Sequence, residues 1–267
     1  MKKLNERFLP EVLSYSLREP EFNLFLIGDL ENYGMDSDNV AVYTSDDWKE
    51  GLFPYVILNY RNNIVFYSHT INFDAETVAA FLSGIPMKNL SGKKVLIERL
   101  IPFFKGLEIV PTYLSRLDRV VCPPENNFPG RRLTAEDVPS IVELLLQIEE
   151  FYTMKDKTEE ENYSDVLESI SHGGRMYGMF EHGKLAAVAG TTAENSVSAM
   201  VVSVATLPQY RGRGYATRLV SKLCKECLDG GMQFLCLFYH NPEAGAIYRK
   251  LGFKEIGEYA MVKSVDM

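Results

Sequence analysis

The sequence predicts an α+β protein built of two consecutive domains, and three observations lead to this prediction. The segment from Cys122 to Gly130, CPPENNFPG, is rich in proline, asparagine and glycine, which is typical of a linker. The residues after it follow the order β-α-α-β-β-β-α-β-α-β, and the residues before it repeat that order. The chain has 267 residues, so each side of the linker has an ordinary domain length. We therefore expect an N-terminal domain at residues 1–125 and a C-terminal domain at residues 126–267.

The C-terminal half begins with a predicted helix, because its first apolar residues have helical spacing. The stretch LTAEDVPSIVELLLQI has Thr134 as a helix N-cap and carries Pro139 in the first turn, where proline is tolerated. A second helix is expected over Glu159 to Ile170. Three runs with the composition of strands follow, RMYGMFE, KLAAVAGTTA and SVSAMVVSVATL, and EHGK is the expected turn between the first two.

An amphipathic helix comes next and ends before Gly230. One of its faces is apolar, and its other face carries Arg218, Ser221, Lys222, Lys225 and Asp229. QFLCLFY is a continuous apolar run, as expected of a strand buried on both faces. NPEAGAIYRKL has Asn241 as N-cap, Pro242 at the first helical position and Gly252 just past its end. A last strand is expected over residues 253–262.

The N-terminal half follows the same order of elements. Helices are expected at Glu6 to Leu17 and Phe22 to Tyr33, followed by the strand-like runs NVAVYTS, FPYVILNY and IVFYSHT. A helix at Ala75 to Leu82, a short strand near Met87, a helix near Lys93 to Phe104 and the strand LEIVPTYLSRL complete it. We interpret this half as a second copy of the same architecture, and an unrelated α+β domain is the alternative.

The composition is that of a globular protein, and the charge excludes some classes of partner. Hydrophobic residues make up 46% and charged residues 24% of the chain. The net charge of −8 argues against a nucleic-acid binder, which usually carries a basic face. No segment has the uninterrupted apolar length needed to span a bilayer, and MKKLNERFLPEVL is not a secretory signal. We therefore expect a cytoplasmic protein that binds neither nucleic acid nor membrane.

The cysteines and histidines do not predict a metal site. Cys224 and Cys227 form a CxxC pair, which invites a zinc or redox interpretation. The pair falls inside a helical pattern and has no second ligand pair near it, so two buried thiols in a reducing compartment are the better interpretation. The histidines His69, His172 and His182 do not have metal-binding spacing with acids or cysteines.

The segment from Arg211 to Ala216, RGRGYA, joins a strand to the amphipathic helix. Its glycines allow a sharp turn and the close approach of a ligand. The N–H groups at a helix start point outward with the positive end of the helix dipole, so they form an anion site. A phosphate or pyrophosphate held mostly by backbone fits this segment, and an ordinary turn with solvated arginines is the alternative. The segment matches neither the Walker loop nor the G-x-G-x-x-G dinucleotide pattern.

Two motifs together resemble a known family. PQYRGRGYATRLV is similar to the pyrophosphate loop of the GNAT superfamily, the acyl-CoA-dependent N-acetyltransferases, whose pattern Q/R-x-x-G-x-G/A is matched by Arg211, Gly214 and Ala216. NPEAGAIYRKLGF resembles the second signature of that family at Asn241, Ala244, Tyr248, Gly252 and Phe253. The resemblance covers Arg131 to Met261 and is greatest to the subgroup in which another domain precedes the acetyltransferase half.

The resemblance implies a fold and a cosubstrate. The fold would be a tandem of GNAT-like domains, each a mixed, mostly antiparallel sheet flanked by helices, with a parallel pair of strands at the CoA site of the C-terminal domain. The pantetheine arm of acetyl-CoA would run between the strand at residues 235–239 and the strand residues Val204, Ala205 and Thr206. The pyrophosphate would lie near Arg211, on the N–H groups of Gly212, Arg213, Gly214, Tyr215, Ala216 and Thr217. Asn241 would bind the pantetheine arm, act as a plain N-cap, or do both.

The resemblance also implies a proton donor, but it does not supply a base. In the family, the tyrosine at the position of Tyr248 protonates the departing CoA thiolate; an inward tyrosine that only packs is the alternative. Many relatives place a glutamate on the fourth or fifth strand, and this chain has no acid in either strand. The remaining candidates for a base are His240, Glu149, Glu150 and Glu194, and spacing singles out none of them.

The expected function is transfer of an acetyl group from acetyl-CoA to an amine acceptor, a small molecule or a peptide, by direct attack in a ternary complex. A non-catalytic acyl-CoA sensor or interaction module is the alternative, because no base is evident. The stretch SHTINFDAETVAAFL of the N-terminal half stands where the loop should be. It has no glycine, and Asp74 and Glu76 would repel an anion there. We therefore expect a degenerate N-terminal copy that binds no CoA.

Overall fold

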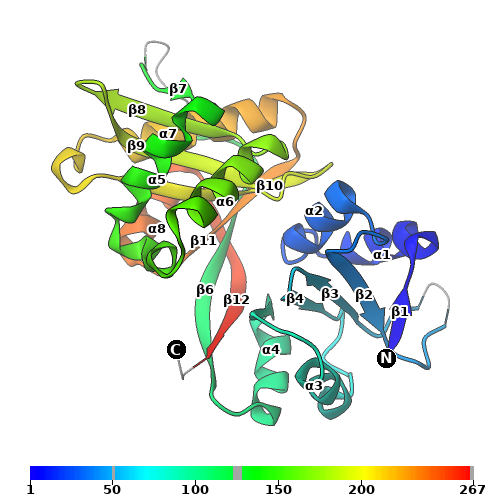
Figure 1. Cartoon of the computed structure of the whole chain (residues 1–267). Helices are drawn as coiled ribbons and strands as arrows, with labels where there is room; N and C mark the ends of the chain where they lie inside the picture. Colours follow the sequence, from blue (N-terminus) through cyan, green and yellow to red (C-terminus); the bar gives the residue numbers. More distant parts are fainter. Residues whose placement is uncertain (50–51, 123–127, 265–267) are drawn as a thin grey trace. The chain divides into compact units, whose positions relative to one another are not determined.

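The computed structural model describes residues 1–49, 52–122 and 128–264 (Figure 1). The chain divides into two compact units. Unit 1 comprises Met1–Leu114 and Ile256–Met267, and unit 2 comprises Ser115–Glu255. The expected domain boundary between residues 125 and 126 lies outside the described residues and stays a prediction.

Unit 1 begins with a short strand and two helices, as the sequence order requires. Its elements are β1 (Lys2–Leu4), η1 (Glu6–Phe8), α1 (Leu9–Ser16), α2 (Leu24–Tyr33), β2 (Val40–Thr44), β3 (Val56–Tyr60), β4 (Asn63–Tyr67), α3 (Ala75–Ser83), β5 (Asn89–Lys93), α4 (Lys94–Leu100), η2 (Ile101–Phe103) and most of β6 (Leu107–Leu117). The final strand, β12 (Lys254–Ser264), contributes its residues from Ile256 onward to this unit.

The sheet of unit 1 has the order β1-β2-β3-β4-β5-β12. Its neighbours are antiparallel except β4 and β5, which are parallel, with Phe66 opposite Gly92. Along β2, the buried residues Val40 and Val42 alternate with partly exposed ones, so one side of the strand faces the core. This core also contains Leu26 of α2.

Unit 2 contains the elements β7 (Arg131–Arg132), η3 (Ala135–Asp137), α5 (Val138–Leu146), η4 (Glu149–Asp156), α6 (Glu159–Ser171), β8 (Met176–Glu181), β9 (Lys184–Thr192), β10 (Ser198–Thr206), η5 (Pro208–Tyr210), α7 (Tyr215–Asp229), β11 (Phe234–Tyr239) and α8 (Pro242–Leu251). The first turn of α6 is stabilised by a capping box, in which Thr158 accepts from the N–H of Glu161 and the Glu161 carboxylate accepts from the N–H of Thr158. Of the helices that the structure describes, none is long and apolar enough to cross a membrane.

The sheet of unit 2 runs β7-β8-β9-β10-β11, antiparallel except for the parallel pair β10 and β11. Helices cover both of its faces. Successive residues of β9 point to opposite faces of the sheet, so they pack against different helices. Val188 packs in the same cluster as Ile141 of α5, whereas Ala187 packs in the cluster of Leu219 and Leu223 of α7. Figure 1 shows α5 and α6 along one of these faces.

The predicted fold class is confirmed. Both units have helices and a mostly antiparallel sheet, and in each the third long strand pairs in parallel with the strand after the next helix: β4 with β5, and β10 with β11. The leading strand of the predicted order, to which no residues were assigned, is β1 in unit 1 and β7 in unit 2.

Candidate functional site

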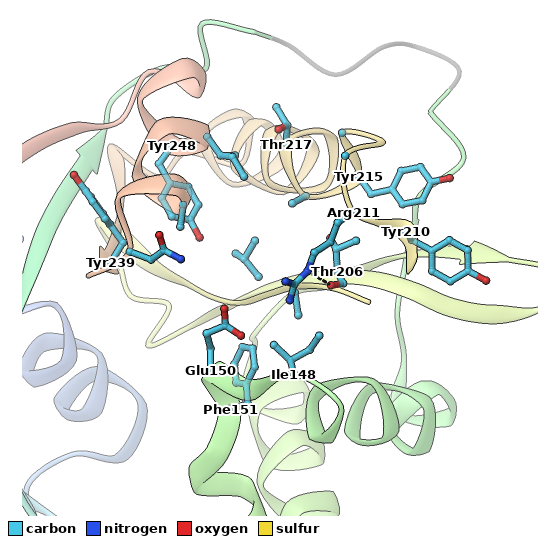
Figure 2. A pocket seen from close by; sticks show the side chains of 18 of the residues that line it. Ile148, Glu150, Phe151, Thr206, Tyr210, Arg211, Tyr215, Thr217, Tyr239 and Tyr248 are labelled. Carbon is cyan, nitrogen blue, oxygen red and sulfur yellow. Dashed lines mark hydrogen bonds between the residues drawn. The ribbon is translucent and has the colours of Figure 1, made fainter. Parts of the chain in front are cut away.

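A cavity of about 600 Å³ lies in unit 2 at the carboxyl ends of β10 and β11. Residues from η4, β10, the loop before α7, β11 and α8 line it. They are Ile148, Glu150, Phe151, Val204, Ala205, Thr206, Tyr210, Arg211, Gly212, Gly214, Tyr215, Ala216, Thr217, Phe238, Tyr239, His240, Asn241, Ala244, Ile247 and Tyr248. Both sequence motifs therefore meet at one cavity (Figure 2).

The cavity opens because the parallel strands β10 and β11 separate. Their pairing covers Ser198–Met200 opposite Phe234–Cys236 and extends no further. Farther along β10, the register to β9 shifts between Val202 and Ala205, and Ser203 has a positive φ of 54°. This β-bulge lies in the part of β10 beyond its pairing with β11, and bulges are common beside active sites.

The loop before α7 presents backbone donors to this cavity. Gly212 and Gly214 have φ angles of 77° and 74°, which only glycine adopts without strain. A Cβ atom at Gly212 would have nothing within 4 Å, and one at Gly214 would have only Arg218 Nε, at 3.9 Å. Within the described residues, the N–H groups of residues 212–217 have no hydrogen-bond acceptor. The loop therefore has both the space and the donors for an anion.

The arginines of the loop differ in position. Arg211 lines the cavity, and its Nε donates to the carbonyl of Thr206 at 3.2 Å, as Figure 2 shows. Arg213 is not among the lining residues, and its guanidinium lies 5.3 Å from the ring centroid of Tyr210. Arg218 supports the loop from α7, because its Nη2 donates to the carbonyl of Arg213 at 2.8 Å.

Tyr248 enters the cavity from α8. Its ring lies between those of Tyr239 and Phe253, with centroids 6.1 and 6.0 Å away. Among the described residues its hydroxyl has no hydrogen-bond partner. Burial raises the pKa of Tyr248 to about 12, so the phenol is protonated at neutral pH. The hydroxyl is therefore a proton donor that points into the cavity (Figure 2).

Two of the four candidate bases line the cavity. Glu150, at the start of η4, points into it from the side opposite Tyr248 (Figure 2), and His240 follows β11. Glu149 is not among the lining residues. Glu194 lies before the start of β10, at the opposite end of that strand, where Thr191 Oγ1 donates to it at 2.5 Å and Arg175 lies 3.5 Å away.

In the segment Ile148 to Phe151 the sequence offers Glu149 and Glu150 as candidate bases, but it does not predict that Ile148 and Phe151 line the cavity. This segment follows α5 in irregular and 3₁₀ conformation, which hydrophobic periodicity does not detect. The CxxC residues Cys224 and Cys227 are buried on α7, and Arg175 Nη1 donates to Cys227 Sγ at 2.8 Å. Within the described ranges, no group of three or more His, Cys, Asp or Glu side chains is placed to hold a metal ion.

The comparison with protein families agrees with the position of this cavity. The model of the acetyltransferase (GNAT) family matches residues 139–253. This range includes α5 through α8 and therefore nearly every element that lines the cavity. No curated protein matches the chain.

Solved structures share the fold, and several of them match over nearly the whole length of both chains. A Drosophila protein is 14% identical with a TM-score of 0.71, and the match covers 99% of this chain and 98% of that one. A tandem GNAT protein from the clavulanic acid biosynthesis pathway is 12% identical with a TM-score of 0.61, over 98% and 97% of the two chains. A putative GNAT-family acetyltransferase from Novosphingobium aromaticivorans is 21% identical with a TM-score of 0.53, over 78% of this chain and 88% of that one. Residues 139–253 therefore match the acetyltransferase (GNAT) family, and the fold of the whole chain is similar to that of a tandem GNAT protein.

Proposed function

We propose that this protein transfers an acetyl group from acetyl-CoA to an amine acceptor by direct attack in a ternary complex. One observation carries the proposal: a single cavity is lined by a glycine loop and by Tyr248, and neither the N–H groups of that loop nor the Tyr248 hydroxyl has a hydrogen-bond partner among the described residues. The acceptor is a small-molecule or peptide amine, and a cytoplasmic location stays part of the proposal.

The residues of the cavity fit the parts of acetyl-CoA, which would supply an activated acyl group as a thioester. The N–H groups of residues 212–217 would hold the pyrophosphate at the start of α7. From Val204 to Thr206, the edge of β10 on the side of β11 lies beyond the pairing of these two strands, and this edge would bind the amides of the pantetheine arm. Asn241 lies at the end of β11 and would contact the same arm.

Groups around the cavity would then carry out the individual steps of the transfer. A backbone N–H at the bulge near Val204 would polarise the thioester carbonyl, as an oxyanion-type donor does. Tyr248 would donate its proton to the departing sulfur, and the burial that raises its pKa keeps that proton on the phenol. Glu150 and His240 are the two candidates that could accept a proton from the attacking amine. Holding the two reactants in one complex supplies much of the rate.

The test is the release of CoA thiol from acetyl-CoA in the presence of a panel of amines, together with the affinity for CoA by calorimetry. Amine-dependent thiol release supports the transferase. Binding of CoA without release for any amine would favour the alternative, an acyl-CoA sensor or interaction module. No binding of CoA would refute both.

A further inference from the structure

A second cavity, of about 240 Å³, lies in unit 2 beside the first. Residues of α5, η4, α6, β8, β9 and β10 line it. We infer that this cavity holds the body of the acceptor, and that the acceptor is a small primary amine with a single apolar group. The inference rests on the proposed function and adds a substrate class to it.

The position of the second cavity suits an acceptor. Phe151 lines both cavities. Ser203 lines the second cavity and Val204, the next residue of the β10 bulge, lines the first. A molecule in the second cavity therefore meets the first one at the bulge, where the thioester carbonyl would lie. Glu150, next to Phe151 in the chain, lines the first cavity at the same end of η4.

The surface of the second cavity is mostly apolar, although seven of its thirteen lining residues are polar. It includes Leu145, Phe151, Met154, Val166, Met176 and Val202. An amine body that fills such a lining gains free energy by leaving water, whereas a polar body would lose hydrogen bonds.

Four of the polar side chains of the lining are engaged with the protein itself, and the other three are the hydroxyl side chains of Ser169, Thr192 and Ser203. The buried side chain of Asn162 donates from its amide to the carbonyl of Met154 at 2.8 Å. Thr191 Oγ1 donates to Glu194. Lys157 Nζ pairs with Asp165 Oδ2 at 2.6 Å, and both side chains are about half exposed. The one carboxylate of the lining, Asp165, is therefore already neutralised by a lysine.

These features disfavour an acceptor with several positive charges. Each additional ammonium group in the cavity would need its own anionic partner, because an unpaired charge away from water is costly. The volume is also below the range of about 300 to 1,000 Å³ that holds drug-sized ligands, so the body is about as large as one aromatic ring or one branched chain. Polyamines and aminoglycosides therefore fit the lining poorly, and an arylalkylamine or an alkylamine fits it well.

The test fills the second cavity without touching the first. Val166 on α6 lines it, whereas Leu167, the next residue, is 43% exposed and is not among its lining residues. Val166→Trp should weaken the binding of phenethylamine by at least about tenfold, measured by ligand-observed NMR, because the larger side chain occupies the space. Leu167→Trp is the matched control and should bind phenethylamine like the wild type. All three proteins should bind CoA equally.

The amine panel tests the class of acceptor. Phenethylamine and hexylamine should have higher kcat/KM values than spermidine, and Val166→Trp should raise KM for phenethylamine with CoA affinity unchanged. Equal binding of phenethylamine to Val166→Trp and wild type, or a preference for spermidine, would overturn the inference. Failure of the proposed function would look different, because the wild type would then release no CoA thiol with any amine of the panel, whether or not it bound CoA.

A second variant covers the case in which Val166→Trp does not fold. Val166→Ala removes two methyl groups and enlarges the cavity. It should raise the kcat/KM of naphthylethylamine relative to that of phenethylamine. An unchanged ratio would also overturn the inference.

Discussion

Replacing Tyr248 with phenylalanine removes a single hydroxyl from the cavity and leaves the ring in place. The ring contacts with Tyr239 and Phe253 remain, and no hydrogen-bond partner among the described residues loses its donor. The free energy of unfolding should therefore change by less than about 1 kcal/mol. As a general acid, the hydroxyl should contribute about 10²- to 10⁴-fold to turnover, which is about 3 to 5 kcal/mol of the barrier.

The assay is the initial rate of thiol release with saturating acetyl-CoA and amine. We expect turnover to fall with CoA affinity almost unchanged, because the hydroxyl acts on the leaving sulfur and not on the loop. Tyr177→Phe is the matched control, since Tyr177 is another tyrosine of unit 2 that donates its hydroxyl proton to Glu226 and does not line the cavity. A loss of less than about threefold in Tyr248→Phe would make Tyr248 a packing residue.

The pH profile gives a second measurement on Tyr248. Because burial raises its pKa to about 12, the phenol stays protonated across the range in which amines lose their protons. The wild-type turnover should therefore rise with pH as the amine is deprotonated, and it should not fall below about pH 10 through loss of the Tyr248 proton. A falling limb near neutral pH that disappears in Tyr248→Phe would contradict this reasoning.

Three further predictions follow from the same structure. Gly214→Asp should abolish CoA binding measured by calorimetry, because the side chain is bulky, repels the pyrophosphate and strains a backbone that has a φ of 74°. Arg211→Ala should weaken CoA binding only modestly, because backbone groups provide most of the site. Glu150→Gln should lower turnover about 10²-fold and His240→Asn less than about threefold, since Glu150 lines the first cavity and is followed by Phe151, which lines both. The reverse order of initial rates would assign the base to His240. Burial raises the pKa of Tyr259 to about 12, so its stabilising contribution is complete below about pH 10 and is lost as pH rises towards 12. Urea unfolding at pH 9 and 11 should show a smaller loss of stability in Tyr259→Phe than in the wild type.

The local parts of the fold were predictable from the sequence because their signals are local. The helix α7 follows the 3.6-residue period of its apolar face, and Leu219 and Leu223 are fully buried. The turn that precedes it needs two left-handed residues, and the sequence has glycine at both, Gly212 and Gly214. The amphipathic pattern fails at Ser221, which was expected to face solvent. Ser221 is buried and donates to the carbonyl of Cys122 at 2.6 Å, because the segment leading to the linker covers that face.

Non-local pairing could not be predicted in the same way. The residues of β12 from Ile256 onward belong to unit 1, where Tyr259 lies opposite Lys93 of β5 and Thr112 Oγ1 donates to the carbonyl of Tyr259. Alternation along a strand predicts which residues are buried but does not identify the neighbouring strand. Spacing also could not single out Glu150 among the four candidate bases, because its place in the lining of the cavity depends on the irregular segment after α5.

The parallel strand pairs of the two units differ, and this difference explains why one chain should bind one CoA. In unit 2, β10 and β11 stop pairing after Met200, and the cavity lies beyond that point. In unit 1, the equivalent parallel strands pair from Asn63 to Phe66, and a Cβ atom at Gly92 would lie 2.4 Å from the carbonyl oxygen of Phe66, so the backbones are in close contact where the other pair is open.

The helix that follows in unit 1 is also closed to an anion. Asp74 caps α3 by accepting from the N–H of Thr77 at 3.1 Å, which places a carboxylate where a pyrophosphate would have to bind. The hydrogen bonds from Thr77 lower the pKa of Asp74, so the carboxylate is charged at neutral pH. Calorimetry on the full-length chain should give one CoA per chain, Gly214→Asp should remove it entirely, and Asp74→Asn should leave the stoichiometry at one. Two sites in the wild type, or residual binding in Gly214→Asp that becomes tighter when Asp74 is also changed to asparagine, would show that unit 1 retains a CoA site of its own.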